Sequence, residues 1–153
     1  MIQPYHVVNA LPPTADAFAG TVTTDVISMR SWNHCTFIIQ YGEGDTGQSV
    51  ITMEACNDIT PSHTEAIPFG YRECMSGDTF GAMEKVEASG FTTKAGSNKM
   101  VRIEVTSRTL PEDKPYVRLK AVESADGPVN GGVVAILSNP RYGGDAPDTV
   151  LAL

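Results

Sequence analysis

The chain reads CTFIIQY from Cys35 to Tyr41, GEGDTG from Gly42 to Gly47 and QSVITMEA from Gln48 to Ala55. The first run is almost continuously β-branched and aromatic, which predicts a central strand covered on both faces. The glycines of the second run supply the positive φ angles that a hairpin loop needs. The third run alternates apolar and polar residues from Ile51 onward, as a strand with one buried face does. Two neighbouring strands joined by a short loop therefore decide the fold class.

Similar strand signals continue along the rest of the chain. Residues Met100–Thr106 and Tyr116–Val122 alternate cleanly, and Gly132–Ser138 is a second apolar run that we expect to be covered on both faces. No window of about 12 residues has the period of a helix, although Ala82–Ala88 allows one helical turn. We predict an all-β fold, namely an antiparallel, jelly-roll-like β-sandwich of about eight strands in a single domain.

The two ends of the chain differ from this central part. We expect residues 1–22 to form an extended N-terminal arm with a short strand near its start. Pro12 and Pro13 favour polyproline geometry and cannot join the interior of a sheet. Such an arm is either a free tail or a segment that orders on a neighbouring subunit. The β-sandwich domain is expected at residues 23–142 and a C-terminal tail at residues 143–153.

Charge is unevenly distributed along the sequence. The net charge is −7, yet seven basic and three acidic residues give the stretch 94–120 a charge of +4, leaving −11 for the rest. An acidic chain is poorly suited to non-specific nucleic-acid binding, which depends on neutralising phosphates. The basic stretch is either a solvated strand face or a docking surface for an acidic partner. The candidate partner-binding residues are Arg102, Arg118, Lys120, Pro12 and Pro13.

Cysteine content and hydropathy bear on where the protein is made. Cys35, Cys56 and Cys74 are odd in number and form no CxxC motif, which favours a reducing folding compartment over a disulfide framework. The N-terminal residues lack the cationic and apolar regions of a signal peptide. No run approaches the roughly 18 apolar residues that span a membrane. We therefore expect synthesis in a cytoplasm and no membrane partner.

No sequence pattern for catalysis or metal binding is present. His6, His34 and His63 lie on separate segments without HxH or HExxH spacing, and there is no GxSxG nucleophile elbow. The glycines of residues 42–47 open no helix, so they predict no phosphate site. The acidic loops lack the DxDxDG pattern of a calcium site. We predict a protein that is not an enzyme and has no metal or cofactor.

Several short motifs follow one another in an order that is informative. In chain order they are Val26–Trp32, Cys35–Ile39, Ala55–Asp58, Ala66–Arg72, Ile103–Val105, Tyr116–Leu119 and Ala135–Tyr142. This order resembles small virion proteins of tailed bacteriophages that are encoded near the major capsid protein. The resemblance implies a capsid decoration (cement) protein on the capsid exterior, made in the host cytoplasm. It further implies a homotrimer that docks on the lattice of the major capsid protein and stabilises the shell against internal DNA pressure.

The alternative function is a carbohydrate- or receptor-binding β-sandwich module. Such modules present exposed aromatic side chains as platforms for sugars, and Trp32, the single tryptophan, is the candidate platform. Aromatic residues make up 7% of the chain, which is little for this purpose. The other explanation of Trp32 is packing in the core. Its exposure in the folded protein separates the two explanations.

Overall fold

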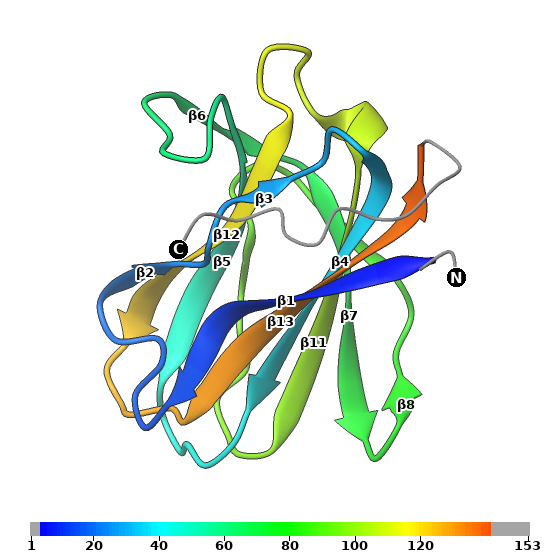
Figure 1. Cartoon of the computed structure of the whole chain (residues 1–153). Helices are drawn as coiled ribbons and strands as arrows, with labels where there is room; N and C mark the ends of the chain where they lie inside the picture. The colour runs from blue at the N-terminus through cyan, green and yellow to red at the C-terminus, as the bar shows by residue number, and fades with distance from the viewer. Residues whose placement is uncertain (1–3, 142–153) are drawn as a thin grey trace.

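The computed structural model describes residues 4–141, which form two antiparallel sheets packed face to face (Figure 1). The predicted β-sandwich is confirmed. The seven-stranded sheet contains β1 (Tyr5–Thr14), β4 (Trp32–Tyr41), β7 (Phe69–Ser76), β8 (Thr79–Phe80), β9 (Glu84–Val86), β11 (Lys99–Thr106) and β13 (Gly131–Pro140). The six-stranded sheet contains β2 (Thr21–Thr23), β3 (Ile27–Ser28), β5 (Gln48–Cys56), β6 (Thr64–Ile67), β10 (Phe91–Thr92) and β12 (Tyr116–Ala125). No helix in the described range is long and apolar enough to cross a membrane.

The strand pairing is nested, with the first strand beside the last. Strand β1 pairs with β13, β2 and β3 with β12, β4 with β11, and β5 with β10. This amounts to a long hairpin rolled into two sheets, whose central pairs are β13 with β4 and β12 with β5. Such a rolled hairpin of eight strands is a jelly roll. The predicted jelly-roll-like architecture is therefore confirmed by the strand order.

Strands β6 to β9 are inserted between the fourth and fifth strands of the roll. Strand β6 extends the edge of β5, and β7 extends the seven-stranded sheet beyond β11. Strand β9 lies within the segment Ala82–Ala88, where the sequence allowed a helical turn, and pairs with β7. The backbone there is extended because it completes a ladder with β7. The insertion thus adds strands to both sheets without adding a second domain.

The core lies between the two sheets and is built from alternate residues of each strand. Phe37, Ile103 and Leu137 of one sheet face Met53 and Leu119 of the other, and all five are buried. The Tyr71 and Phe91 rings stack with centroids 3.8 Å apart, which ties the insertion to the six-stranded sheet. Burying such side chains contributes roughly 1.5–3 kcal/mol each. The fold is therefore held by a single continuous apolar core.

The prediction that two strands are covered on both faces is wrong. In β4, buried residues alternate with half-buried or exposed ones, and Ile38 and Gln40 lie on the outer face. In β13 the same alternation leaves Val134 exposed. A jelly roll has two layers, so each sheet has one face toward the core and one toward solvent. The apolar residues on the outer face are therefore surface residues.

The structure also differs from the extended arm expected at residues 1–22. Residues 5–14 form strand β1 and pair with β13, as Figure 1 shows for the blue and orange strands. Pro12 and Pro13 are accommodated because β1 is an edge strand whose register shifts twice after Asn9. The expected C-terminal tail, residues 143–153, lies outside the described residues.

Candidate functional site

The three candidate cations do not form one stripe. Arg102 lies on β11 between the buried residues Val101 and Ile103, so it points from the outer face of the seven-stranded sheet. Arg118 and Lys120 alternate with buried residues on β12, so they lie on the outer face of the six-stranded sheet. These two outer faces are opposite sides of the sandwich. A single partner surface cannot contact all three side chains.

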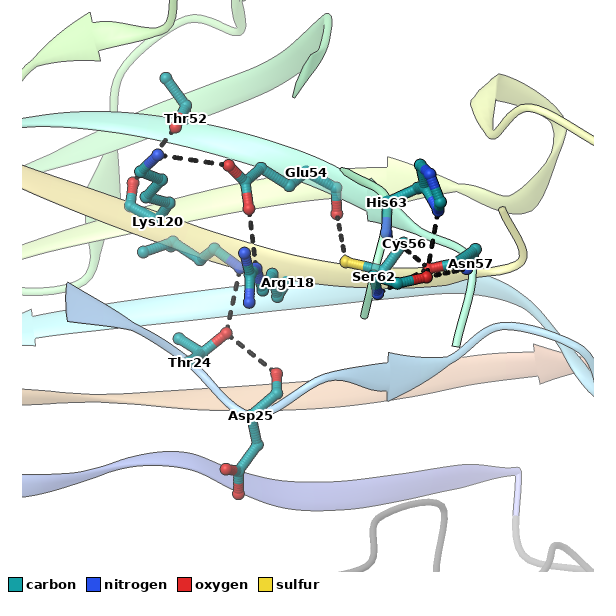
Figure 2. A network of polar contacts seen from close by, with 11 residues as sticks. Thr24, Asp25, Thr52, Glu54, Cys56, Asn57, Ser62, His63, Arg118 and Lys120 are labelled. Carbon is teal, nitrogen blue, oxygen red and sulfur yellow. Dashed lines mark hydrogen bonds and ion pairs between the residues drawn. The ribbon is translucent and has the colours of Figure 1, made fainter. Parts of the chain in front are cut away.

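Arg118 and Lys120 both pair with Glu54, as Figure 2 shows. The register of β5 and β12 places Glu54 directly opposite Arg118. The Arg118 Nε donates to Glu54 Oε2 at 2.7 Å, and Lys120 Nζ lies 3.5 Å from Glu54 Oε1. Only 10% of the Glu54 side chain is exposed, and both cationic side chains contact its carboxylate. The sequence analysis treated Arg118 and Lys120 as available to a partner and did not identify Glu54 as their internal carboxylate partner.

Other basic residues of the stretch 94–120 are paired as well. Lys94 Nζ lies 2.5 Å from Glu73, and this hydrogen bond raises the pKa of Lys94. Lys114 contacts Glu65 and its neighbour Asp113, each at 3.2 Å, and Arg102 contacts Glu104. Five of the seven basic residues in this stretch therefore have carboxylate partners. The positive charge of the sequence segment is largely cancelled in three dimensions.

The turn after β5 is closed by polar contacts that are structural in kind (Figure 2). Asn57 Oδ1 accepts hydrogen bonds from the backbone N–H groups of Ser62 and His63, which fixes the loop that leads into β6. The nearby Cys56 thiol donates to the Glu54 carbonyl, and burial raises its pKa to about 11. A neutral, buried thiol is a poor nucleophile. Among residues 4–141, no group of three or more His, Cys, Asp or Glu side chains gathers as a metal site.

A Ser–His–Glu cluster, which the sequence analysis missed, lies on the outer face of the seven-stranded sheet. Ser138 Oγ lies 3.3 Å from His34 Nδ1, and His34 Nε2 lies 3.6 Å from Glu104. The three residues come from neighbouring strands β13, β4 and β11, so only strand pairing reveals the cluster. None of them lines the groove formed by Leu11, Ile38 and Val134. The cluster is a polar contact across three neighbouring strands.

Apolar side chains cover the other half of the same outer face. Tyr5, Val7 and Val134 are exposed to 57%, 54% and 39%, and Ile38 and Ile136 are half-buried. The register places Val7 beside Ile136 and Val134 beside Ile38, so the five side chains form one patch across β1, β13 and β4. We term these five residues the apolar face. Contiguous apolar patches on a folded surface mark interaction sites.

A groove of about 570 Å³ continues from the apolar face. Ile38 and Val134 line it together with Leu11 of β1, and the ion pair of Glu73 with Lys94 lies in its wall. This volume is within the range of small-ligand sites. Pro13 of the candidate residues also lines the groove, whereas Pro12 is exposed on β1 and does not. The sequence carried a signal for this surface, because the apolar runs of β4 and β13 have apolar residues on both faces.

Trp32 is fully buried in the core. It begins β4 and packs with the other large apolar side chains. Core packing is therefore the correct explanation of this residue. A buried indole cannot serve as a sugar platform, so this form of the carbohydrate hypothesis is wrong.

No protein-family model matches the chain, and no curated protein matches it either. Among solved structures, the crystal structure of the SPBc2 prophage-derived protein YomS is similar with a TM-score of 0.50. The two chains are 15% identical, and the likeness covers 88% of this chain and 93% of that one. At this identity the likeness is one of fold over nearly the whole length of both chains.

Proposed function

We propose that this chain is a structural protein of a tailed-phage particle. It binds the outside of the capsid through the apolar face and stabilises the lattice of the major capsid protein. The observation that carries the proposal is the contiguous apolar face on an otherwise acidic protein. A rigid sandwich that carries the apolar face suits a role in which many weak contacts are repeated by symmetry. The fold likeness to a prophage-derived protein is compatible with a phage origin.

Two matched valines test the proposal. Val134 lies on the apolar face and Val122 on the outer face of the six-stranded sheet, and their exposures are 39% and 37%. Val134→Lys places a charge in the proposed contact, whereas Val122→Lys adds the same charge on the opposite side. Capsids assembled without this chain are mixed with each variant and sedimented. Val134→Lys places an ammonium group in an apolar contact, and burying an unpaired charge is costly, so the variant should weaken binding by at least about tenfold.

Three results decide the matter. Loss of binding with Val134→Lys alone supports docking through the apolar face. Equal binding of both variants, or loss in both, removes the apolar face as the docking surface. A wild-type chain that does not sediment with capsids at all removes the decoration function.

The groove favours one alternative, a binding module for a small extended ligand such as a glycan. It combines apolar walls with the carboxylate of Glu73 and the ammonium of Lys94. Screening the protein against a glycan panel tests this, with Lys94→Ala as the variant that should lose binding and Val122→Lys as the control. Glycan binding that survives Lys94→Ala would place the ligand elsewhere.

A further inference from the structure

Strand β1 is a long open edge of the seven-stranded sheet. In the described residues it pairs with β13 on one side and has no strand on the other. The other outer strands are short, from the two residues of β8 and β10 to the four of β6, whereas β1 has ten. Native proteins keep exposed edges short or charged, because an open edge is a template for another strand.

The first half of β1 carries none of the usual protection, because Pro12, Pro13 and both register shifts come after Asn9. Residues Tyr5–Thr14 include no lysine, arginine, aspartate or glutamate. Within residues 4–141, one backbone hydrogen bond reaches the outward edge of β1: the Asp25 N–H donates to the Ala10 carbonyl at 2.9 Å. No strand in this described range pairs with the outward edge of Tyr5–Asn9. This is the segment that a further strand would pair with.

The alternation of the ladder shows which backbone groups point outward. The Gly42 N–H donates to the Asn130 carbonyl at 2.6 Å, so Asn130 and every second residue after it on β13 point toward β4. The intervening residues Ala135 and Leu137 therefore point toward β1, where they oppose Val8 and His6. It follows that the peptide groups of Tyr5, Val7 and Asn9 point away from the sheet.

We propose that a second copy of this chain pairs with β1 through its own β1. The two strands run antiparallel about a two-fold axis at Val7, so that each Tyr5 lies opposite the other copy's Asn9. This register uses all the outward peptide groups of Tyr5, Val7 and Asn9, giving about six backbone hydrogen bonds. It joins the two seven-stranded sheets into one continuous sheet, a recognised mode of strand addition.

The choice of a second copy rests on charge. Each chain carries −7, so most surfaces of two copies repel each other. The segment Tyr5–Asn9 has no Lys, Arg, Asp or Glu, so it brings no like-charge pair into the contact. A two-fold axis at Val7 places the same segment of the second copy opposite it. The inference is independent of the proposed function. The proposed assembly is a two-fold dimer, whereas the virion resemblance implies a homotrimer.

Analytical ultracentrifugation of the full chain at about 100 μM, with a Val7→Pro variant, tests the proposal. Proline at Val7 removes an outward N–H, and edge strands tolerate proline, so folding is retained. The wild type should sediment as a dimer and Val7→Pro as a monomer, with the dissociation constant raised at least about tenfold. Val134→Lys, on the neighbouring strand, should leave the dimer intact, which separates this contact from capsid docking.

Cross-linking covers the case in which Val7→Pro does not fold. In a Cys74→Ser background, Val7→Cys should form a disulfide-linked dimer under mild oxidation, and Val122→Cys should not. A monomeric or trimeric wild type, or equal cross-linking at both positions, overturns the proposal. A dimer that appears only after deletion of residues 142–153 also overturns it, because the chain's own C-terminal segment would then occupy the edge.

Discussion

The contact between Glu54 and Arg118 should be the strongest ion pair of the protein. The Nε to Oε2 distance is 2.7 Å, and the exposed fractions of the two side chains are 10% and 21%. Exposed pairs contribute about 0.2–1 kcal/mol, while breaking fully buried ones costs about 3–5 kcal/mol. This pair lies between these limits, so we expect a coupling energy of about 2 kcal/mol. Glu54→Ala should lower the melting temperature by about 4–8 °C in a domain of this size.

A double-mutant cycle measures this coupling directly. The free energy of unfolding is obtained from urea denaturation of the wild type, Glu54→Ala, Arg118→Ala and the double variant. A matched cycle on Glu65 and Lys114 is the control, since their 3.2 Å pair includes a Glu65 side chain that is 56% exposed. We expect less than about 0.5 kcal/mol for the control. The Glu54 coupling should also survive about 0.5 M salt better than the control, because buried pairs are screened less.

A coupling below about 0.5 kcal/mol, or one equal to that of the control pair, would refute the reasoning. Arg118 would then be energetically independent of Glu54, and its side chain would be available to an acidic partner as the sequence predicted. A coupling near 2 kcal/mol would mean that Arg118→Ala lowers the stability of the fold itself, whether or not Arg118 contacts a partner. Any binding defect of that variant would then have to be corrected for unfolding.

Three further predictions concern the fold. Gly90→Ala should destabilise by at least about 2 kcal/mol by urea denaturation, because its φ is +75° and a Cβ would overlap the Ile51 carbonyl oxygen. Burial raises the pKa of Cys56 from 9.0 to about 11 and that of Tyr71 from 10.0 to about 12. The unfolded chain therefore loses these protons first, and the free energy of unfolding should fall as pH rises from 9 to 12; a flat profile would contradict this. Trp32→Phe should lower the free energy of unfolding by less than about 2 kcal/mol, because it removes an indole N–H that has no acceptor among residues 4–141. Trp32→Ala should lower it by about 4 kcal/mol, because it leaves a cavity in the core.

The strands that alternate cleanly were predictable from sequence. Met100–Thr106 corresponds to β11 and Tyr116–Val122 to most of β12, since one face of each is apolar and the other carries charges. In these two strands local pattern and tertiary environment agree, so sequence alone is sufficient. The hairpin predicted at residues 42–47 was wrong, because β4 and β5 lie in different sheets and the loop between them crosses from one layer to the other. Gly42, Gly44 and Gly47 are also not among the glycines with positive φ.

The outer face of the seven-stranded sheet was not predictable in the same way. An apolar run such as Gly132–Ser138 has the same pattern whether a second layer covers it or a partner does. Only a short strand near the start of β1 was predicted, because proline is a general argument against a sheet interior and says nothing about a sheet edge. The pairing of Arg118 with Glu54 depends on the register of two strands that are 64 residues apart. Register between distant strands is a tertiary property that no local pattern encodes.

The internal pairing of charge explains where this protein can make contacts. Three of the carboxylates that neutralise the basic stretch, namely Glu54, Glu65 and Glu73, come from other strands. Five of the eleven basic residues are held in such pairs, and the chain as a whole carries a net charge of −7. Close approach of like-charged surfaces is then unfavourable except where charge is absent. The apolar face and the edge of β1 meet that condition and adjoin each other at Tyr5 and Val7. The two proposed contacts, capsid docking and pairing between copies, therefore involve the same corner of the seven-stranded sheet. Val134→Lys should weaken capsid docking and leave the dimer intact, whereas Val7→Pro should break the dimer.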